Sequence, residues 1–186
     1  RTAAISYSWM SELYSRAPYV SDRDRVQLDT EGAIQYGMYY WDDNYPDSHV
    51  FAEGECLRKT FDPDFMLYHT MAVDEWGHMK GADSAEYANA VAAVGHLIAA
   101  RMPEWLQTGY QVVVTADHGM NNLGIHVGTE PAQREVALYI FSDKVENGRF
   151  EENYISQLNV APMVCRLLGI PAAEGMKQEL EIQLNK

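Results

Sequence analysis

The chain has 186 residues and a formal net charge of −13 at pH 7, from 27 acidic and 14 basic residues. This excess of negative charge argues against a nucleic-acid duplex or an anionic membrane as partner, because contacts with phosphates require clustered Lys and Arg. No run approaches the roughly 18 uninterrupted apolar residues needed to span a bilayer. With 47% hydrophobic residues, residues 1–186 are predicted to form one globular domain with a polar tail at about 174–186.

The first half of the chain predicts short elements separated by polar segments. Residues 16–30 are polar and interrupted by Pro18, which predicts an exposed excursion. Residues 32–41 are rich in aromatic side chains and fit either a strand or a helix. The clearer elements are a strand over 2–7, a helix beginning at 9–14, and a helix that starts at 46–48 and continues to about 60.

The second half alternates strands and helices more clearly. The expected strands are 65–68, which is predicted to be buried, 111–115 and 136–141. The expected helices are 83–102, with Val91 among the residues of its apolar face and Pro103 near its end, and 154–168, ended by Gly169 and Pro171. This alternation predicts an α/β fold, layered around a mainly parallel sheet.

Two of the predicted strands lead directly into metal-ligand residues. Asp74 and His78 follow the strand at 65–68, and Asp117 and His118 follow the strand at 111–115, with His126 eight residues later. Ligands of parallel sheets bind at the carboxyl ends of the strands, so these side chains are expected at the same end of one sheet. The two segments together therefore predict a metal site.

The spacing of these residues indicates what kind of site it is. Four residues in a helical turn place Asp74 and His78 on one side, whereas Asp117 and His118 are adjacent and converge only if the chain bends at Gly119. Either pattern alone is also common on a solvated helix face or in a plain turn. Imidazole with carboxylate suits zinc, and manganese or iron less selectively. Five ligands exceed the four of a closed tetrahedral site, which indicates two metal ions.

The motif Thr115-Ala-Asp-His-Gly-Met120, preceded by Asp74-x-x-Gly-His78 and followed by His126, resembles the metal-binding half of the alkaline phosphatase superfamily. Its closest branch is nucleotide pyrophosphatase/phosphodiesterase, with phosphonoacetate hydrolase a near relative. The resemblance covers most of the chain and implies an alkaline-phosphatase-like layered sandwich, of which this chain is a fragment of the core. One departure is Val127, where the family has glycine.

The resemblance implies specific roles. Asp74, His78 and His126 resemble the ligands of one zinc ion, and Asp117 and His118 those of a second. The Thr or Ser nucleophile and a further aspartate have no matching position, so they are expected outside this chain and no catalytic nucleophile is assigned within it. The full-length protein is then expected to hydrolyse phosphodiester or nucleotide pyrophosphate bonds. This piece alone is expected to be inactive, with one metal ion or none.

Other functions remain open at this point. A phosphonate hydrolase or a phosphomonoesterase of the same superfamily would use the same ligands, and a non-catalytic module could retain the metal site. The substrate is expected to be a small phosphate ester or a nucleotide. Trp76 and His49 are candidate substrate contacts. His69 either donates to a metal ligand or packs in the core.

The aromatic residues of the segment 36–41 could stack on a nucleobase or pack in the core. Cys56 and Cys165 lie far apart in the sequence and are predicted to be reduced, buried thiols. They favour the cytoplasm slightly over the periplasm, and nothing in the sequence predicts an oligomeric state.

Overall fold

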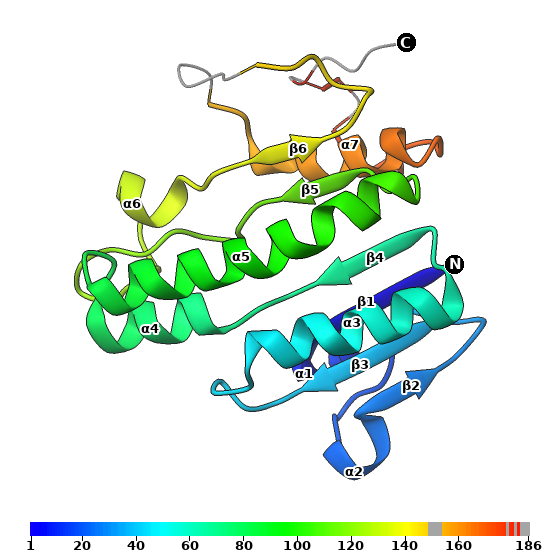
Figure 1. The fold of residues 1–186 in the computed structure, drawn as a ribbon, viewed down its shortest axis with the longest axis horizontal. Coiled ribbons are helices and arrows are strands. Elements are labelled where there is room, and N and C mark those ends of the chain that lie inside the picture. The colour runs from blue at the N-terminus through cyan, green and yellow to red at the C-terminus, as the bar shows by residue number, and fades with distance from the viewer. Residues whose placement is uncertain (149–153, 178, 181, 183–186) are drawn as a thin grey trace. The chain divides into compact units, whose positions relative to one another are not determined.

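The computed structural model describes residues 1–148, 154–177, 179–180 and 182 (Figure 1). The chain divides into two compact units, residues 1–101 with 117–136 and residues 102–116 with 137–186, and each is described by itself. The single domain over 1–186 stays a prediction. Part of the predicted polar tail at 174–186 lies outside the described residues.

The first unit is built on a four-stranded sheet in the order β2-β3-β1-β4. Its central strand β1 runs parallel to both β3 and β4, whereas the edge strand β2 is antiparallel to β3. The predicted α/β fold with a mainly parallel sheet is therefore confirmed, and the ambiguous segment 32–41 contributes a strand. The strands are β1 (Thr2–Tyr7), β2 (Val26–Leu28), β3 (Tyr36–Tyr40) and β4 (Phe65–Tyr68).

Both faces of β1 are covered, because four consecutive residues, Ala3 to Ser6, are buried. Helix α3 (Asp47–Phe61) lies along the sheet in Figure 1, and α1 (Ser8–Tyr14) packs beside β1 and β3. The core gathers around Ile5, Tyr40 and Val50. Tyr39 and Tyr40 are buried in this sheet. For these two residues the structure therefore supports packing in the core and not stacking on a nucleobase. Strand β4 is only half-buried, less than predicted.

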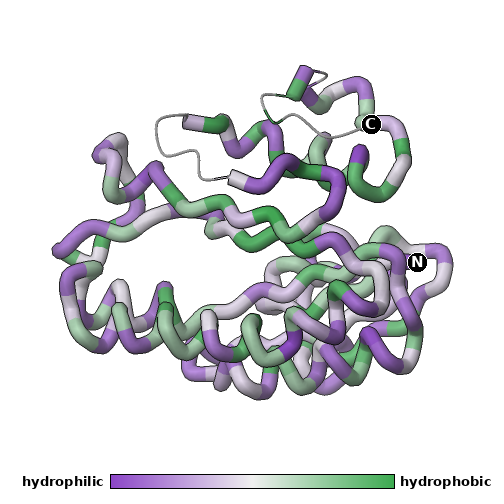
Figure 2. Tube along the Cα trace, turned by 45° about the horizontal axis from the view of Figure 1, so that its top comes forward, coloured by the Kyte–Doolittle hydropathy of each residue, from purple (hydrophilic) through white to green (hydrophobic). Residues whose placement is uncertain are grey.

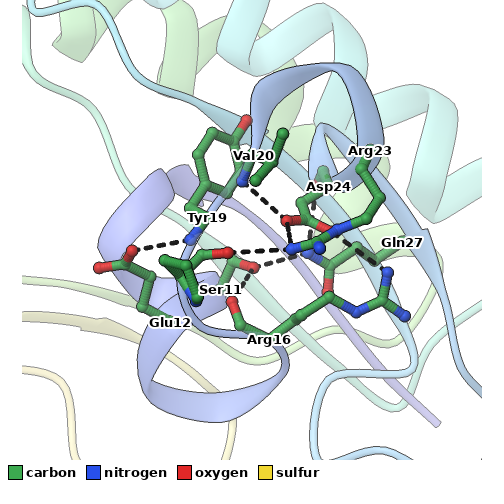
Figure 3. Close-up of polar contacts among 9 residues, drawn as sticks. Ser11, Glu12, Arg16, Tyr19, Val20, Arg23, Asp24 and Gln27 are labelled. Atoms are coloured by element: carbon green, nitrogen blue, oxygen red, sulfur yellow. Dashed lines mark hydrogen bonds and ion pairs between the residues drawn. The ribbon is translucent and has the colours of Figure 1, made fainter.

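The segment 16–30 is mostly exposed, as its polarity predicted, but it is not devoid of structure. It contains α2 (Ser21–Asp24) and β2, and the side chain of Asp24 is fully buried. Its carboxylate accepts hydrogen bonds from Val20 N at 2.8 Å, from Arg23 Nε and Nη2 at 2.7 and 2.6 Å, and from Arg16 Nη1 at 3.3 Å (Figure 3). A carboxylate can be buried when its oxygens are satisfied in this way, and polarity along the sequence does not reveal such partners.

Two helices follow β4, namely α4 (Ala72–Lys80) and α5 (Ala85–Gln107). The predicted start of α5 is confirmed, because Ser84 Oγ accepts a hydrogen bond from Tyr87 N at 3.1 Å. The predicted end near Met102 is wrong, since the helix continues through Pro103. Pro103 cannot donate a backbone hydrogen bond, which costs the helix free energy. Burial of the Trp105 side chain, which is 6% exposed, offsets this cost.

Hydrophobic and hydrophilic positions are interleaved along the helices (Figure 2). Within the predicted apolar face of α5, Val91 is exposed. In the part of the chain that the structure describes, no helix combines the length and the apolarity needed to cross a bilayer.

The second unit holds a separate two-stranded sheet, in which β5 (Val112–Val114) pairs antiparallel with β6 (Tyr139–Phe141). Helix α7 (Val160–Leu167) follows a short 3-10 turn at Gln157–Asn159, so it begins later than predicted. Met163 and Leu167 of α7 form a core with apolar side chains of the two strands. Because β5 pairs with β6 and not with β4, the expectation that both ligand-bearing strands belong to one sheet is wrong.

Both cysteines are free. Cys56 lies exposed on α3 and Cys165 is half-buried on α7. The prediction that both thiols are buried is therefore wrong for Cys56 and holds only in part for Cys165, and their redox state stays a prediction.

Candidate metal centre

The five predicted ligands form one cluster within the first unit. Asp74 lies between two imidazoles, with His78 Nε2 at 3.5 Å from Oδ2 and His118 Nε2 at 3.7 Å from Oδ1. His118 Nε2 is also 3.7 Å from Asp117 Oδ1. The ring of His126 stacks on that of His118 at 3.8 Å between centroids and lies edge-on to His78 at 5.0 Å. Helix α4 and the loop from 117 to 126 thus bring these residues together.

The orientation of two imidazoles is set by backbone carbonyls. His78 Nδ1 lies 2.8 Å from Gly124 O, and His118 Nδ1 lies 3.0 Å from Gly119 O. A carbonyl oxygen can only accept, so each Nδ1 carries the hydrogen and donates it. In the neutral imidazole, Nε2 then carries the lone pair and faces Asp74. Metal-ligating histidines are typically held in this way.

The loop that carries His126 is folded tightly against α4. Gly124 has a φ of +73°, and a Cβ there would lie 2.7 Å from His78 O. Asn121 Oδ1 accepts hydrogen bonds from the backbone N–H groups of Leu123 and Ile125, at 3.0 and 2.9 Å. The loop therefore needs glycine at position 124. Val127, the departure from the family pattern, is 76% exposed, so its larger side chain lies at the surface.

The residues present fit a metal ion. Among the described residues, the buried Oδ1 of Asp74 accepts no hydrogen bond. Asp74, His118 and His126 each offer one ligand atom, and these atoms lie within 4.8 Å of one another. Ligands about 2.1 Å from a tetrahedral zinc ion are about 3.4 Å apart, so side-chain shifts on the order of 1 Å would close the site. One carboxylate with two imidazoles is a donor set suited to zinc.

The closest grouping in the structure differs from the one that the resemblance implied. Asp74 and His126 were expected to share an ion with His78, whereas their close partner here is His118. Asp74 contacts both histidines, one through each oxygen. The division of the five residues between two ions stays a prediction, as does the identity of the metal.

The two candidate substrate residues lie in different places. Trp76 is partly exposed on α4, between the predicted ligands Asp74 and His78. His49 is exposed near the start of α3, where its ring lies edge-on to Tyr45 at 5.8 Å. Trp76 is therefore the one whose sequence neighbours belong to the cluster. A substrate role for either residue stays a prediction.

His69 is half-buried and lies against aromatic side chains. The hydroxyl of Tyr40 donates to His69 O at 2.8 Å and lies 3.2 Å from His69 Nδ1, and Trp9 packs edge-on against the ring at 5.2 Å. Burial lowers the pKa of His69, while the carboxylates of Asp117 and Asp74 act in the opposite direction. These contacts support the core alternative for His69.

Sequence reasoning missed the groups that orient the ligands, namely the carbonyls of Gly119 and Gly124. The sequence does contain a glycine near each histidine, Gly119 after His118 and Gly124 before His126. Glycine allows the backbone to approach closely, so these positions could have indicated that a carbonyl contacts an imidazole.

The family described as type I phosphodiesterase / nucleotide pyrophosphatase matches residues 4–149. The chain belongs to this family, which is part of the alkaline phosphatase superfamily, and the resemblance seen in the sequence is confirmed. Membership places it among proteins of phosphoester hydrolase or transferase chemistry.

The chain is also similar to individual proteins. It is 28% identical to the mouse GPI ethanolamine phosphate transferase 3, catalytic subunit, over 161 residues, which are 82% of this chain and 15% of that protein. The human protein of the same name is 27% identical over 161 residues, with the same coverage. GPI ethanolamine phosphate transferase 2 of Schizosaccharomyces pombe is 26% identical over 132 residues, 60% of this chain and 17% of that protein. The chain thus spans about 15% of the length of these relatives. No solved structure matches the chain at a significant level.

Proposed function

We propose that this chain supplies the metal-binding part of an enzyme that cleaves a phosphodiester and transfers its ethanolamine phosphate group to a hydroxyl acceptor. The observation that carries the proposal is the cluster of Asp74, His78, Asp117, His118 and His126, in which a buried carboxylate oxygen faces imidazole nitrogens. The metal is zinc in this proposal, with two ions in the complete site. The Thr or Ser nucleophile belongs to a part of the protein outside this chain.

Zinc bound there would act as a Lewis acid toward the phosphate group and lower the pKa of a coordinated hydroxyl. The chain's own residues hold the site in shape. The hydrogen bonds of His78 and His118 to backbone carbonyls aim both Nε2 atoms at Asp74. Asp74 and Asp117 add two negative charges, which favour divalent cations in the cluster. Those cations in turn make the site attractive to an anionic substrate, although the chain as a whole carries a charge of −13.

Transfer and hydrolysis differ only in the final acceptor. In both, the bond between phosphorus and the donor alcohol breaks, and the phosphoryl group is held covalently on the nucleophile until an acceptor oxygen attacks and gives up its proton. The relatives named GPI ethanolamine phosphate transferases favour a hydroxyl acceptor on a GPI glycolipid. The family description favours the second candidate, hydrolysis of phosphodiester or nucleotide pyrophosphate bonds with water as acceptor.

Side chains next to His126 support an acceptor or donor with an apolar part. Ile125 and Val127, its two neighbours, are 42% and 76% exposed, and Leu123 is 81% exposed. Aliphatic groups exposed this close to a ligand suit a lipid-linked substrate better than a nucleotide, whose recognition relies on polar and aromatic groups.

The test uses the full-length protein, a phosphodiester labelled in its ethanolamine part, and a GPI acceptor. Label on the GPI acceptor reports transfer, and free labelled ethanolamine phosphate reports hydrolysis. A chelator is expected to stop both, and His126→Ala is expected to lower the rate at least about 100-fold. His96→Ala, on the exposed side of α5, is the matched control and keeps the rate. Turnover that survives both the chelator and His126→Ala would refute the proposal.

Metal content of the 186-residue chain tests the centre without any substrate. Mass spectrometry is expected to find about one zinc ion per chain, lost in His126→Ala and kept in Asp117→Ala. Two fully occupied zinc ions per chain would contradict the assignment of further ligands to another part of the protein.

The remaining proposals follow from this function. The substrate is a small phosphate ester or a lipid-linked one, nucleic-acid duplexes are not partners, and the compartment stays a prediction.

A further inference from the structure

Gln133 is a buried residue that the proposed chemistry does not use. It lies on the short helix α6 (Pro131–Arg134) and is 5% exposed. Its backbone carbonyl accepts a hydrogen bond from Gly119 N at 2.9 Å, and its side-chain Nε2 donates to Ile125 O at 3.2 Å. Gln133 therefore contacts two loop segments that are separate in the sequence.

Each of these segments adjoins a predicted ligand. Gly119 follows His118 and accepts the hydrogen bond from its Nδ1 at 3.0 Å, and Ile125 directly precedes His126. The rings of these two histidines stack at 3.8 Å with an interplanar angle of 14°. Gln133 thus joins the backbones on the two sides of this stack, in addition to the hydrogen bond that Ile125 O accepts from Asn121 N at 3.1 Å.

The approach of the loop to α6 is close. A Cβ at Gly119 would lie 2.1 Å from Ala132 O, so only glycine allows the backbone to reach the helix there. The other end of the Gln133 amide is also held, because Oε1 accepts a hydrogen bond from Glu130 N at 3.2 Å. The amide is fixed at both ends, and its Nε2–H is therefore aimed at Ile125 O.

We propose that Gln133 is a positioning residue, whose Nε2–H bond to Ile125 O sets the spacing of His118 and His126 and thereby the affinity of the centre for metal. The metal part rests on the proposed function, whereas the ring spacing does not. The bland alternative is that Gln133 only caps α6. Capping requires only Oε1, whereas positioning requires the Nε2–H donor. A substitution that keeps the acceptor and removes the donor therefore separates the two roles.

Gln133→Glu makes this separation. The carboxylate still accepts from Glu130 N but cannot donate to Ile125 O. Gln133→Met, apolar and of similar length, removes the donor without adding charge and serves as a second variant if the glutamate variant does not fold.

Gln35→Glu is the matched control. Gln35 also joins two backbone segments, because its Nε2 donates to Thr30 O at 2.7 Å and its Oε1 accepts from Thr2 N at 3.1 Å. It precedes β3, whereas Asp74 comes after the end of the parallel strand β4. The control therefore removes the same kind of hydrogen bond at the amino ends of the parallel strands, away from the carboxyl ends that Asp74 follows.

Two measurements on the 186-residue chain decide the proposal. In the metal-free protein, nuclear Overhauser effects between the His118 and His126 rings are expected in the wild type and in Gln35→Glu, and are expected to be lost in the Gln133 variants. In zinc titrations, the Gln133 variants are expected to bind about 10- to 100-fold more weakly, and Gln35→Glu within about twofold of the wild type.

Ring contacts and zinc affinity that are both unchanged in folded Gln133 variants would overturn the proposal. An equal loss in Gln35→Glu would also overturn it, because the effect would then be general destabilisation. If the wild-type chain binds no zinc, the proposed metal centre fails, but the ring contacts of the metal-free protein still decide the role of Gln133.

Discussion

Asp24 and Asp74 are two carboxylates of the same structural unit with opposite surroundings. Asp24 is fully buried and is surrounded by donors from Val20, Arg23 and Arg16 (Figure 3). The buried Oδ1 of Asp74 accepts no hydrogen bond from the described residues and lies 3.7 Å from His118 Nε2, and the other oxygen, Oδ2, lies 3.5 Å from His78 Nε2. Lone pairs that face a carboxylate are stabilised only when a cation or a proton lies between them.

The two carboxylates differ in where their compensating positive charge comes from. The chain itself supplies the positive charge for Asp24, and the hydrogen bond from Arg23 lowers the pKa of its carboxyl to about 2. Around Asp74 the chain supplies acceptors and leaves the positive charge to a ligand. The first arrangement is that of a structural ion-pair network, and the second is the one expected of the proposed metal centre.

The largest effect on stability is expected from Asp24→Asn. The substitution leaves two arginines with an uncharged partner, and the melting temperature is expected to fall by on the order of 10 °C. Circular dichroism during heating measures this fall. Asp22→Asn, at an exposed position of the same helix α2, is the matched control and should change the melting temperature little. An unchanged melting temperature in Asp24→Asn would show that its ion pairs do not stabilise the fold.

Asp74→Asn should do the reverse. The metal-free protein is expected to keep its melting temperature or gain slightly, because the substitution removes a negative charge that lacks a donor. Zinc affinity is expected to fall by about 100-fold, since a carboxylate ligand is lost. Calorimetric zinc titration measures the affinity, and Glu75→Gln on the same helix is the control. Undiminished zinc binding in Asp74→Asn would remove Asp74 from the centre.

Gly124→Ala tests whether the loop must lie against α4 for the centre to form. The residue has a φ of +73°, and the new methyl group would meet His78 O at 2.7 Å. We expect a loss of about 1–3 kcal/mol in unfolding free energy, together with weaker zinc binding. Gly109→Ala is the control, because Gly109 has a φ of +93° with no neighbour within 4 Å of a Cβ. Its zinc affinity should stay unchanged, and an equal loss in both variants would attribute the effect to strain alone.

The smallest effect concerns pH and is confined to acid. The pKa of Asp24 is about 2 in the folded protein and about 3.9 in an unfolded chain. Between these values the unfolded state binds more protons, so stability rises with pH. The contribution of Asp24 is therefore fully present above about pH 4 and is lost as the pH falls toward 2. Urea unfolding between pH 2 and 5 measures it, and the slope should be shallower in Asp24→Asn. An equal slope in both proteins would contradict the pairing of Asp24.

The parts of the fold that depend on local pattern could be predicted. Strand β1, helix α3 and the Ser84 start of α5 follow from apolar runs and helix-start residues. The end of α5 could not, because burial of Trp105 in the folded chain outweighs the local effect of Pro103. The pairing of β5 with β6 depends on partners distant in the sequence, which a local pattern does not reveal.

For the candidate site, the sequence by itself determined which residue types are present and at what spacing, and those fix the donor set as imidazole and carboxylate. Asp74 and His78 share a side of α4 because four residues are about one helical turn. Only the tertiary structure decided that Asp74 lies against His118, which nitrogen each histidine presents, and that Asp24 is buried. The physical reason is that these features depend on hydrogen-bond partners from other segments, and such partners meet only when the backbone is folded.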